Sequence, residues 1–486
     1  MTQGRSATRN MLKLIIKRFF QGVGILFILA LLYFSPNIYH IYKWNPVFTP
    51  LSAKFYGEAE TVAEARLDDL DFLRKLPTID RSFTPETLAL FERDVSALEA
   101  RAASLTDAEF ALGVARAVAQ ADNGHTNIGQ RDLITKNNRL PFRFYWFDGH
   151  LHVVRAAPGH EALLGAEVLA FGDTPVGAAH RTANSYFGGQ DNWRSYMSTA
   201  ILESPALLHA AGITGAADST SLTLRLEGGT SLTESFDALP AMPEVSFRGL
   251  FPWMVLTARP LPGDDGTWST LAARWTEPPT YLANPDTPYF FEERQNGATL
   301  YVNVSFMLDA GGLSIGTFWQ NLESHIAGRR YDTIILDLRN NPGGDFNTSV
   351  ASVARLPDHL TDGGTFYIAT NGATFSAAIV NTSVAKFHGG DKAHIIGTRV
   401  GDRDQFWAEG GFPFDLPHSD YRVSFATGYH DWVNGCMDRH PLCYDGNEGV
   451  ENPIASLDPD IRVPLTFADY AAGTDPVLKL IGTKQK

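Results

Sequence analysis

The fold is decided by Tyr331-Asp-Thr-Ile-Ile-Leu-Asp-Leu-Arg339 and the glycine loop after it, Asn340-Asn-Pro-Gly-Gly-Asp345. A short apolar run that ends in a glycine loop indicates a buried strand. A second such strand, 365–370, breaks at Asn371-Gly372 and leads through Ser376 into a helical pattern that reaches Phe387. Further strands at 299–304 and 394–397 and a helix at 315–327 extend the alternation. This order predicts an α/β fold with a mainly parallel, helix-covered sheet.

The turn at Ser376 combines two parts of acyl-transfer chemistry. A serine at a strand-to-helix turn lies over the positive end of a helix and is a candidate nucleophile, although a serine here could also be an ordinary helix cap. Gly343 and Gly344 could turn backbone N–H groups toward an oxyanion, with the Ala377 N–H as a further donor. The alternative for the two glycines is a tight turn without a chemical role.

A serine nucleophile needs a base, and His125 is the candidate. It lies in Ala121-Asp-Asn-Gly-His-Thr-Asn127, at a helix end beside a glycine, where an imidazole can reach a cleft. A solvated loop histidine is the alternative. A carboxylate would then orient the ring, and Glu451 is one of many acids that could do so.

Length and charge limit the classes of protein to which the chain can belong. The chain has 486 residues and a net charge of −14, which argues against a nucleic-acid partner.

Helical spacing predicts a helical cap domain over 46–135. Short strands with turn signals fill 136–240, and a stretch rich in proline and glycine, 241–294, is expected to be a linker before a catalytic core at 295–486.

The first 45 residues predict a membrane anchor. Five basic residues precede an uncharged run of 24 residues from Phe19 to Tyr42, long enough to span a bilayer. No small-residue cleavage site follows the run, which favours an uncleaved signal-anchor over a cleaved signal peptide. The basic flank should stay in the cytoplasm, so the body of the protein is expected in the periplasm or outside the cell.

The two cysteines, Cys436 and Cys443, lie close together in a turn-rich loop. In an oxidising compartment a disulfide between them is the simplest interpretation. His440 between them suggests a metal, but three ligands without a fourth make a poor zinc site. We therefore predict no metal and no cofactor.

Together these segments resemble the C-terminal processing, or tail-specific, serine peptidase superfamily. Ile335-Leu-Asp-Leu-Arg-Asn-Asn-Pro-Gly-Gly344 is similar to its glycine-loop motif, and Thr374-Phe-Ser-Ala-Ala378 to its nucleophile turn. Asn123-Gly-His-Thr126 and the closing segments Leu457–Val463 and Asp469–Leu478 also resemble family elements. The resemblance implies a crotonase-like spiral α/β core and a PDZ-like domain over 136–240 that binds extended peptides.

The family has a serine–lysine branch and a histidine-using, tricorn-like branch. The loop 396–404, where the first branch carries its lysine, offers only arginines, which cannot act as a base. The second branch implies Ser376 as nucleophile, His125 as base, Glu451 or Glu448 as orienting acid, and Gly343 or Gly344 with Ala377 as oxyanion donors. The chain departs from that branch at Gly124, where a serine is expected, and at Gly401-Asp402, where a glycine pair is more usual. It also has Ile379 where many related sequences have a glutamate.

These features predict a membrane-anchored serine endopeptidase acting on peptide or protein substrates. Two alternatives remain open at this stage. One is a catalytically weak or inactive relative that binds peptides or envelope proteins through the PDZ-like domain. The other is an acyl hydrolase that acts on esters or lactams with the same nucleophile. The sequence leaves the physiological substrate and the oligomeric state open.

Overall fold

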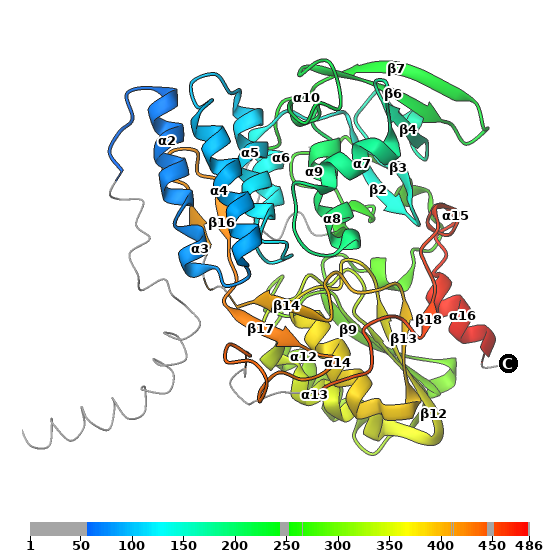
Figure 1. The fold of residues 1–486 in the computed structure, drawn as a ribbon. Coiled ribbons are helices and arrows are strands. Elements are labelled where there is room, and N and C mark those ends of the chain that lie inside the picture. Colours follow the sequence, from blue (N-terminus) through cyan, green and yellow to red (C-terminus); the bar gives the residue numbers. More distant parts are fainter. Residues whose placement is uncertain are drawn as a thin grey trace, which may run out of the picture.

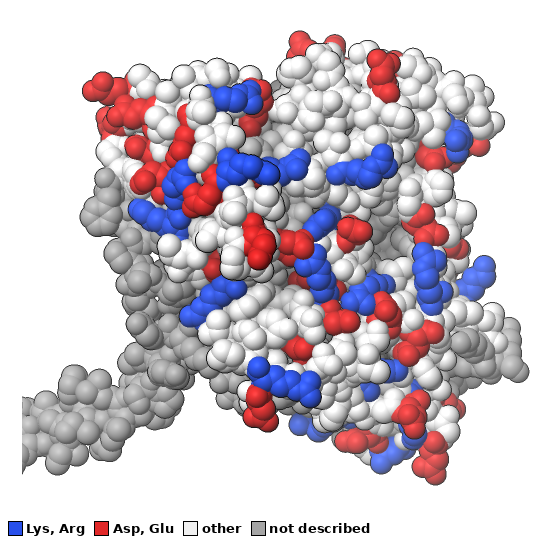
Figure 2. Space-filling view, viewed as in Figure 1, with Lys and Arg blue, Asp and Glu red and all other residues white. Residues whose placement is uncertain are grey.

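The computed structural model describes residues 56–484, except 244–251, 265, 410, 412 and 445–451 (Figure 1). Its N-terminal part is a group of helices: α2 (Val62–Leu73), α3 (Leu76–Ile79), α4 (Pro85–Glu99) and α5 (Asp107–Ala119). Helix α4 begins with Thr84 as N-cap and Pro85 in the first turn, residue types that favour a helix start. Figure 2 shows acidic side chains gathered over these helices.

The middle of the chain forms an antiparallel sheet. Its strands follow the order β2-β3-β4-β6-β7. In addition, β5 pairs with β4 and β8 pairs with β3. The bounds are β2 (Phe142–Phe147), β3 (His150–Ala156), β4 (Glu167–Phe171), β5 (Thr174–Pro175), β6 (Ser219–Arg225), β7 (Ser231–Asp237) and β8 (Ser269–Thr270). The helices that accompany this sheet are α6 (Gln130–Lys136), α7 (Val176–Asn184), α8 (Asp191–Met197), α9 (Thr199–Leu202) and α10 (Pro205–Ala210), and α11 (Pro252–Val255) precedes β8.

The C-terminal part is built on a six-stranded sheet in the order β18-β13-β12-β11-β10-β9. All neighbouring strands in it are parallel except the β9–β10 pair. The bounds are β9 (Tyr289–Arg294), β10 (Thr299–Val304), β11 (Tyr331–Asp337), β12 (Leu360–Thr370), β13 (Ala393–Gly397) and β18 (Ile461–Arg462). The predicted parallel, helix-covered sheet is therefore present.

Helices cover both faces of this sheet. Side chains from α12 (Ile315–Ile326), α13 (Val350–Arg355) and α14 (Ala377–Gly389) share one apolar core with alternate residues of β10 and β11. The opposite face, with Tyr301 and Ile335, packs on Val477 and Ile481 of α16 (Pro476–Lys484), which follows α15 (Phe467–Ala471). Burial on both faces explains the continuous apolar runs in the sequence.

Late segments return to the N-terminal helices and complete two small sheets. Strand β16 (Arg422–Ser424) pairs with β1 (Asn127–Ile128) and β15 (Phe414–Asp415), while β14 (Gln405–Ala408) pairs with β17 (Gly428–Asp431). The β1–β16 pair ties the chain just after His125 to the C-terminal part. Because of this pairing, the loop with His125 lies next to segments that follow the six-stranded sheet's central strands in the sequence.

The structure places short strands in 241–294, the segment expected to be a linker. Strand β8 pairs with β3, and β9 pairs along its whole length with β10, so the segment completes two sheets. Short strands are expected among its prolines and glycines, but the composition does not indicate which sheets they join. The boundary at 294/295 would cut the six-stranded sheet between paired strands.

The predicted anchor within residues 1–45 lies outside the described residues. Among the helices of the described part, none is both long and apolar enough to cross a membrane.

Candidate active site

Ser376 stands at a strained turn between β12 and α14. Its backbone has φ 53° and ψ −124°, and although it occupies the N-cap position of α14, its side chain makes no capping hydrogen bond. A positive φ is uncommon for a residue other than glycine and costs about 1–3 kcal/mol. The hydroxyl is therefore not used as an ordinary helix cap, and the surrounding structure must hold the turn in place.

The glycine loop holds this turn. The Phe375 N–H donates to the Asn341 carbonyl at 2.8 Å, and the Thr374 hydroxyl donates to the Leu338 carbonyl at 2.8 Å. The Asn371 side chain accepts from the Asn340 N–H at 2.9 Å and donates to the Asn340 side chain at 2.7 Å. The two motifs picked out from the sequence are thus one bonded unit.

Gly343 contacts the turn so closely that no other residue fits. Its φ is 105°, and an added Cβ would lie 2.6 Å from the Ser376 Cβ and 2.9 Å from the Ala377 nitrogen. Its own N–H donates to the Asn341 side-chain oxygen at 2.8 Å. The N–H groups of Gly344 and Ala377 have no hydrogen-bond partner among the described residues. Of the three predicted donors, these two are the ones open to an oxyanion.

The fold brings His125 against the residue next to Ser376. The imidazole stacks on Phe375 with centroids 4.3 Å apart and planes 25° from parallel. Its other face stacks on Phe406 at 5.5 Å and 8°. Neither ring nitrogen makes a hydrogen bond to a described residue. The ring is thus held in a plane by two aromatic neighbours, with both nitrogens still available.

Contacts on two sides fix the loop that carries His125, and those to Asp80 are buried. The Thr126 hydroxyl and the Ala426 N–H both donate to Oδ2 of Asp80, at 2.6 and 2.9 Å. Burial raises the pKa of Asp80, against the lowering effect of these hydrogen bonds. On the other side of the loop, the Arg403 guanidinium donates to the Asp122 carbonyl at 2.9 Å and to its carboxylate at 2.7 Å. The loop is anchored from the N-terminal helices and from the C-terminal part.

Among the described residues, the carboxylate that lies against His125 is Asp402, which the sequence did not single out as an acid. Its Oδ2 lies 3.4 Å from the His125 Nδ1, and its side chain is 2% exposed. The sequence did mark this position as unusual, because Asp402 stands where the resembled tricorn-like pattern has a glycine. Glu451, predicted for this position, and its alternative Glu448 lie outside the described residues.

Two basic side chains of the C-terminal part are bonded to carboxylates. Lys386 donates to the Ala393 carbonyl at 2.7 Å and to Asp460 at 2.8 Å. Arg399 is paired with Asp404 and Asp458.

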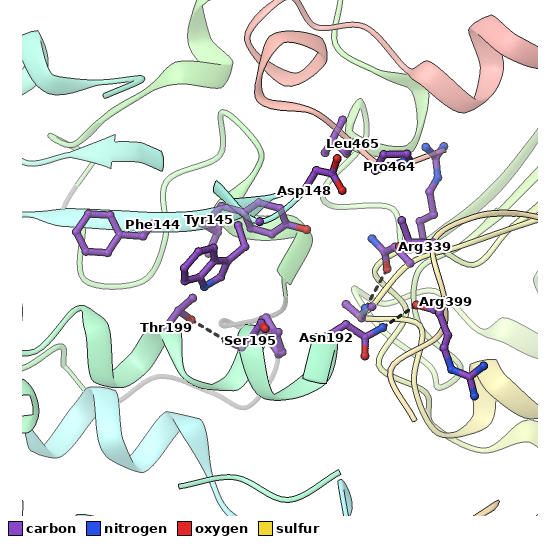
Figure 3. A pocket seen from close by; sticks show the side chains of 18 of the residues that line it. Phe144, Tyr145, Asp148, Asn192, Ser195, Thr199, Arg339, Arg399, Pro464 and Leu465 are labelled. Carbon is purple, nitrogen blue, oxygen red and sulfur yellow. Dashed lines mark hydrogen bonds between the residues drawn. The ribbon is translucent and has the colours of Figure 1, made fainter. Parts of the chain in front are cut away.

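A cavity of about 440 Å³ lies between the antiparallel sheet and the nucleophile turn (Figure 3). Phe144, Tyr145 and Trp146 of β2 form one wall, and the segment 370–373 forms part of another. Asn192 of α8 joins the two sides by donating to the carbonyls of Arg399 and Val400, at 2.8 and 2.9 Å. Neither Ser376 nor His125 lines the cavity, but residues 370–373, which lie just before the serine in the chain, do.

Cys436 and Cys443 form a disulfide with a Cα–Cα distance of 5.5 Å. Among the described residues, no group of three or more histidine, cysteine, aspartate or glutamate side chains is arranged to hold a metal ion.

Comparison with known proteins indicates the fold. No protein-family model and no curated protein sequence matches the chain. Mature CPAF in complex with lactacystin matches 87% of this chain and 98% of its own, at 13% identity and a TM-score of 0.53. A mutant of CPAF matches 86% of this chain and 96% of its own, at 15% identity and a TM-score of 0.53. The chain thus has the overall fold of CPAF. The photosystem II D1 C-terminal processing protease covers 85% of this chain and 98% of its own at 14% identity, but with a TM-score of 0.34, too low to indicate a shared fold.

Proposed function

We propose that the protein is a serine endopeptidase of the C-terminal processing type, in its histidine-using branch. Ser376 would attack the substrate carbonyl, and His125 would take the serine proton and return it to the leaving amine. The observation that carries the proposal is the strained, uncapped Ser376, which contacts Gly343 and whose neighbour Phe375 stacks on His125. The fold shared with CPAF and the motif resemblance support the same activity.

The oxyanion would be stabilised by backbone donors. The Ala377 N–H is at the first position of α14, where helix N–H groups have no partner within the helix and the helix dipole is positive. The Gly344 N–H is the second donor. Preorganised donors of this kind are worth about 3–4 kcal/mol each in acyl transfer.

The substrate would be an extended peptide. Strand β2 is an edge strand of the antiparallel sheet. The Phe144 N–H in it already donates to Glu203 at 2.8 Å, so a peptide backbone bound as in a PDZ-like domain would pair with the rest of this edge. The aromatic cavity beside β2 would take a large apolar or aromatic side chain of that peptide. We also propose that residues 1–45 anchor the protein in a membrane, with the catalytic body in the periplasm or outside the cell.

Peptide turnover tests the proposal. The full chain is incubated with an unfolded polypeptide, and the new termini are mapped by mass spectrometry. Cleavage that Ser376→Ala abolishes supports an endopeptidase. A folded protein that hydrolyses small esters but no polypeptide would support the broader acyl hydrolase. A folded protein with neither activity would support the peptide-binding relative.

A further inference from the structure

Two buried polar atoms face each other beside the nucleophile turn. The His125 Nδ1 and the Asp402 Oδ2 are 3.4 Å apart, and the two side chains are 15% and 2% exposed. Neither atom has a hydrogen-bond partner among the described residues, whereas Asp402 Oδ1 accepts the Arg403 N–H at 2.9 Å. A buried carboxylate oxygen without a partner is costly. A proton on Nδ1 is the donor placed to satisfy it.

We propose that Asp402 is the positioning residue that holds His125 in the Nδ1–H tautomer, in place of the late glutamate. The inference rests on the proposed function of Ser376 and His125. With its proton on Nδ1, the ring turns an N–H toward the carboxylate. With its proton on Nε2, it would turn a lone pair toward a negative charge. The first arrangement leaves Nε2 unprotonated, which is the state that a base for the serine hydroxyl requires.

The aromatic contacts give this tautomer a fixed direction. Phe375 and Phe406 cover the two faces of the imidazole. The imidazole is therefore kept roughly parallel to these two rings and cannot tilt toward either of them. Trp193 stacks on the far side of Phe375 at 3.9 Å, and His430 on the far side of Phe406 at 4.9 Å. Contacts in the plane of the ring therefore decide its orientation, and within the described part of the chain Asp402 supplies the charged one.

Two of the departures from the tricorn-like pattern, Gly124 and Asp402, meet in space. An added Cβ at Gly124 would lie 3.3 Å from the Asp402 Oδ2 and 3.0 Å from the Phe375 ring. A larger residue beside the histidine would therefore press on the carboxylate and on the stacked ring. The glycine at 124 and the acid at 402 are thus compatible with each other, and a serine at 124 would crowd this acid.

The two loops are also joined on both sides of the His125–Asp402 contact. Arg403, next to Asp402, binds the carbonyl and carboxylate of Asp122. The Trp407 N–H donates to the Asn123 side-chain oxygen at 3.2 Å. These bonds hold the 122–126 loop against the 401–407 segment, so the facing pair is part of a defined interface between the two loops.

The test reads the tautomer directly. The full chain is labelled with ¹⁵N-histidine, and long-range ¹H–¹⁵N spectra show which nitrogen of each ring carries the proton. The His125 signals are those lost in His125→Gln. We expect the Nδ1–H form in the wild type and in Glu451→Gln, and a mixture or the Nε2–H form in Asp402→Asn. If Asp402→Asn does not fold, Gly124→Ala displaces the same carboxylate and should give the same change.

A second arm measures the rate of labelling by a fluorophosphonate probe. We expect a fall of at least about 100-fold in Asp402→Asn and no further fall when it is combined with His125→Ala. A His125 tautomer that is unchanged in Asp402→Asn, or that changes in Glu451→Gln instead, overturns the proposal. If the folded wild type is not labelled at all, the proposed function fails, and the tautomer alone still decides the role of Asp402.

Discussion

Phe375 stacks on His125 with ring centroids 4.3 Å apart, although the two residues are 250 positions apart in the sequence. The contact joins a loop after the N-terminal helices to the turn that begins α14. It brings the candidate base to the residue adjacent to the candidate nucleophile. The predictions below change the groups that create or maintain this arrangement.

Gly343→Ala should abolish labelling of Ser376 by a fluorophosphonate. The new methyl group would lie 2.6 Å from the Ser376 Cβ and at a φ of 105°, so the glycine loop must move away from the turn. We expect a fall in labelling rate of at least about 100-fold, since the displaced loop would carry the Gly344 N–H away from the serine and the loss of one oxyanion donor alone has that effect. Gly363→Ala is the matched control, because nothing lies within 4 Å of its added Cβ. Equal rates in Gly343→Ala and the wild type would contradict the site.

Gly124→Ala should slow labelling more than Gly129→Ala. The methyl group at 124 meets Phe375 at 3.0 Å and Asp402 at 3.3 Å, while the one at 129 meets nothing within 4 Å. A shift of the stacked ring by a few tenths of an ångström is enough to disturb proton transfer, so we expect at least a tenfold difference. Similar rates for the two variants would argue against close packing around His125.

Asp80→Ala should destabilise the loop that carries His125. The substitution leaves the Thr126 hydroxyl and the Ala426 N–H without their acceptor in a buried position. The expected loss in free energy of unfolding is about 2–4 kcal/mol, with faster amide exchange in residues 122–128. Thr126→Val removes one of the two donors and should lose less. Unchanged exchange in this loop would show that Asp80 does not anchor it.

The stability of the antiparallel sheet should fall as the pH rises from about 5 to 7. Burial raises the pKa of Glu203 to about 7, although Arg143 and the Phe144 N–H oppose the shift. Between the ordinary value and this raised pKa, the folded protein binds more protons at Glu203 than the unfolded chain, so its contribution to stability is lost with rising pH. The loss is on the order of 2 kcal/mol, at about 1.4 kcal/mol per pKa unit.

Glu203→Gln isolates this contribution, because glutamine does not titrate. The difference in free energy of unfolding between wild type and variant should decrease from pH 5 to pH 8 in chemical denaturation. A difference that stays constant or increases would mean that Glu203 is ionised throughout this range in the folded protein.

Lys386→Ala should leave the labelling rate within about threefold of the wild type. Its ammonium group is bonded to Asp460 and to the Ala393 carbonyl. It contributes to the packing of α14, and its loss is expected to cost about 1 kcal/mol of stability. A loss of labelling as large as that of Ser376→Ala would instead favour a serine–lysine mechanism.

The sequence predicts the local parts of the fold well. The run 299–304 is β10, the run from Tyr331 becomes β11, and the capping signal at Thr84 marks the start of α4. Each of these depends on neighbouring residues and on burial on one or both faces, which periodicity reports. The turn at Ser376 could be located for the same reason.

The surroundings of His125 could not be predicted in this way. Its ring touches Phe375 and Phe406, its Nδ1 faces Asp402, and its loop is anchored by Asp80. These residues come from separate segments, and their meeting depends on long-range packing that leaves no periodic signal. The unusual residues at 124 and 402 were visible as departures, but only the fold shows that they adjoin.

The most direct measurement is the site of fluorophosphonate attachment in the full chain, mapped by peptide mass spectrometry and timed in the wild type and His125→Ala. The account predicts one adduct, on Ser376, that forms at least about 100-fold more slowly without His125. An adduct on another residue, or equally fast modification of Ser376 in His125→Ala, would contradict it.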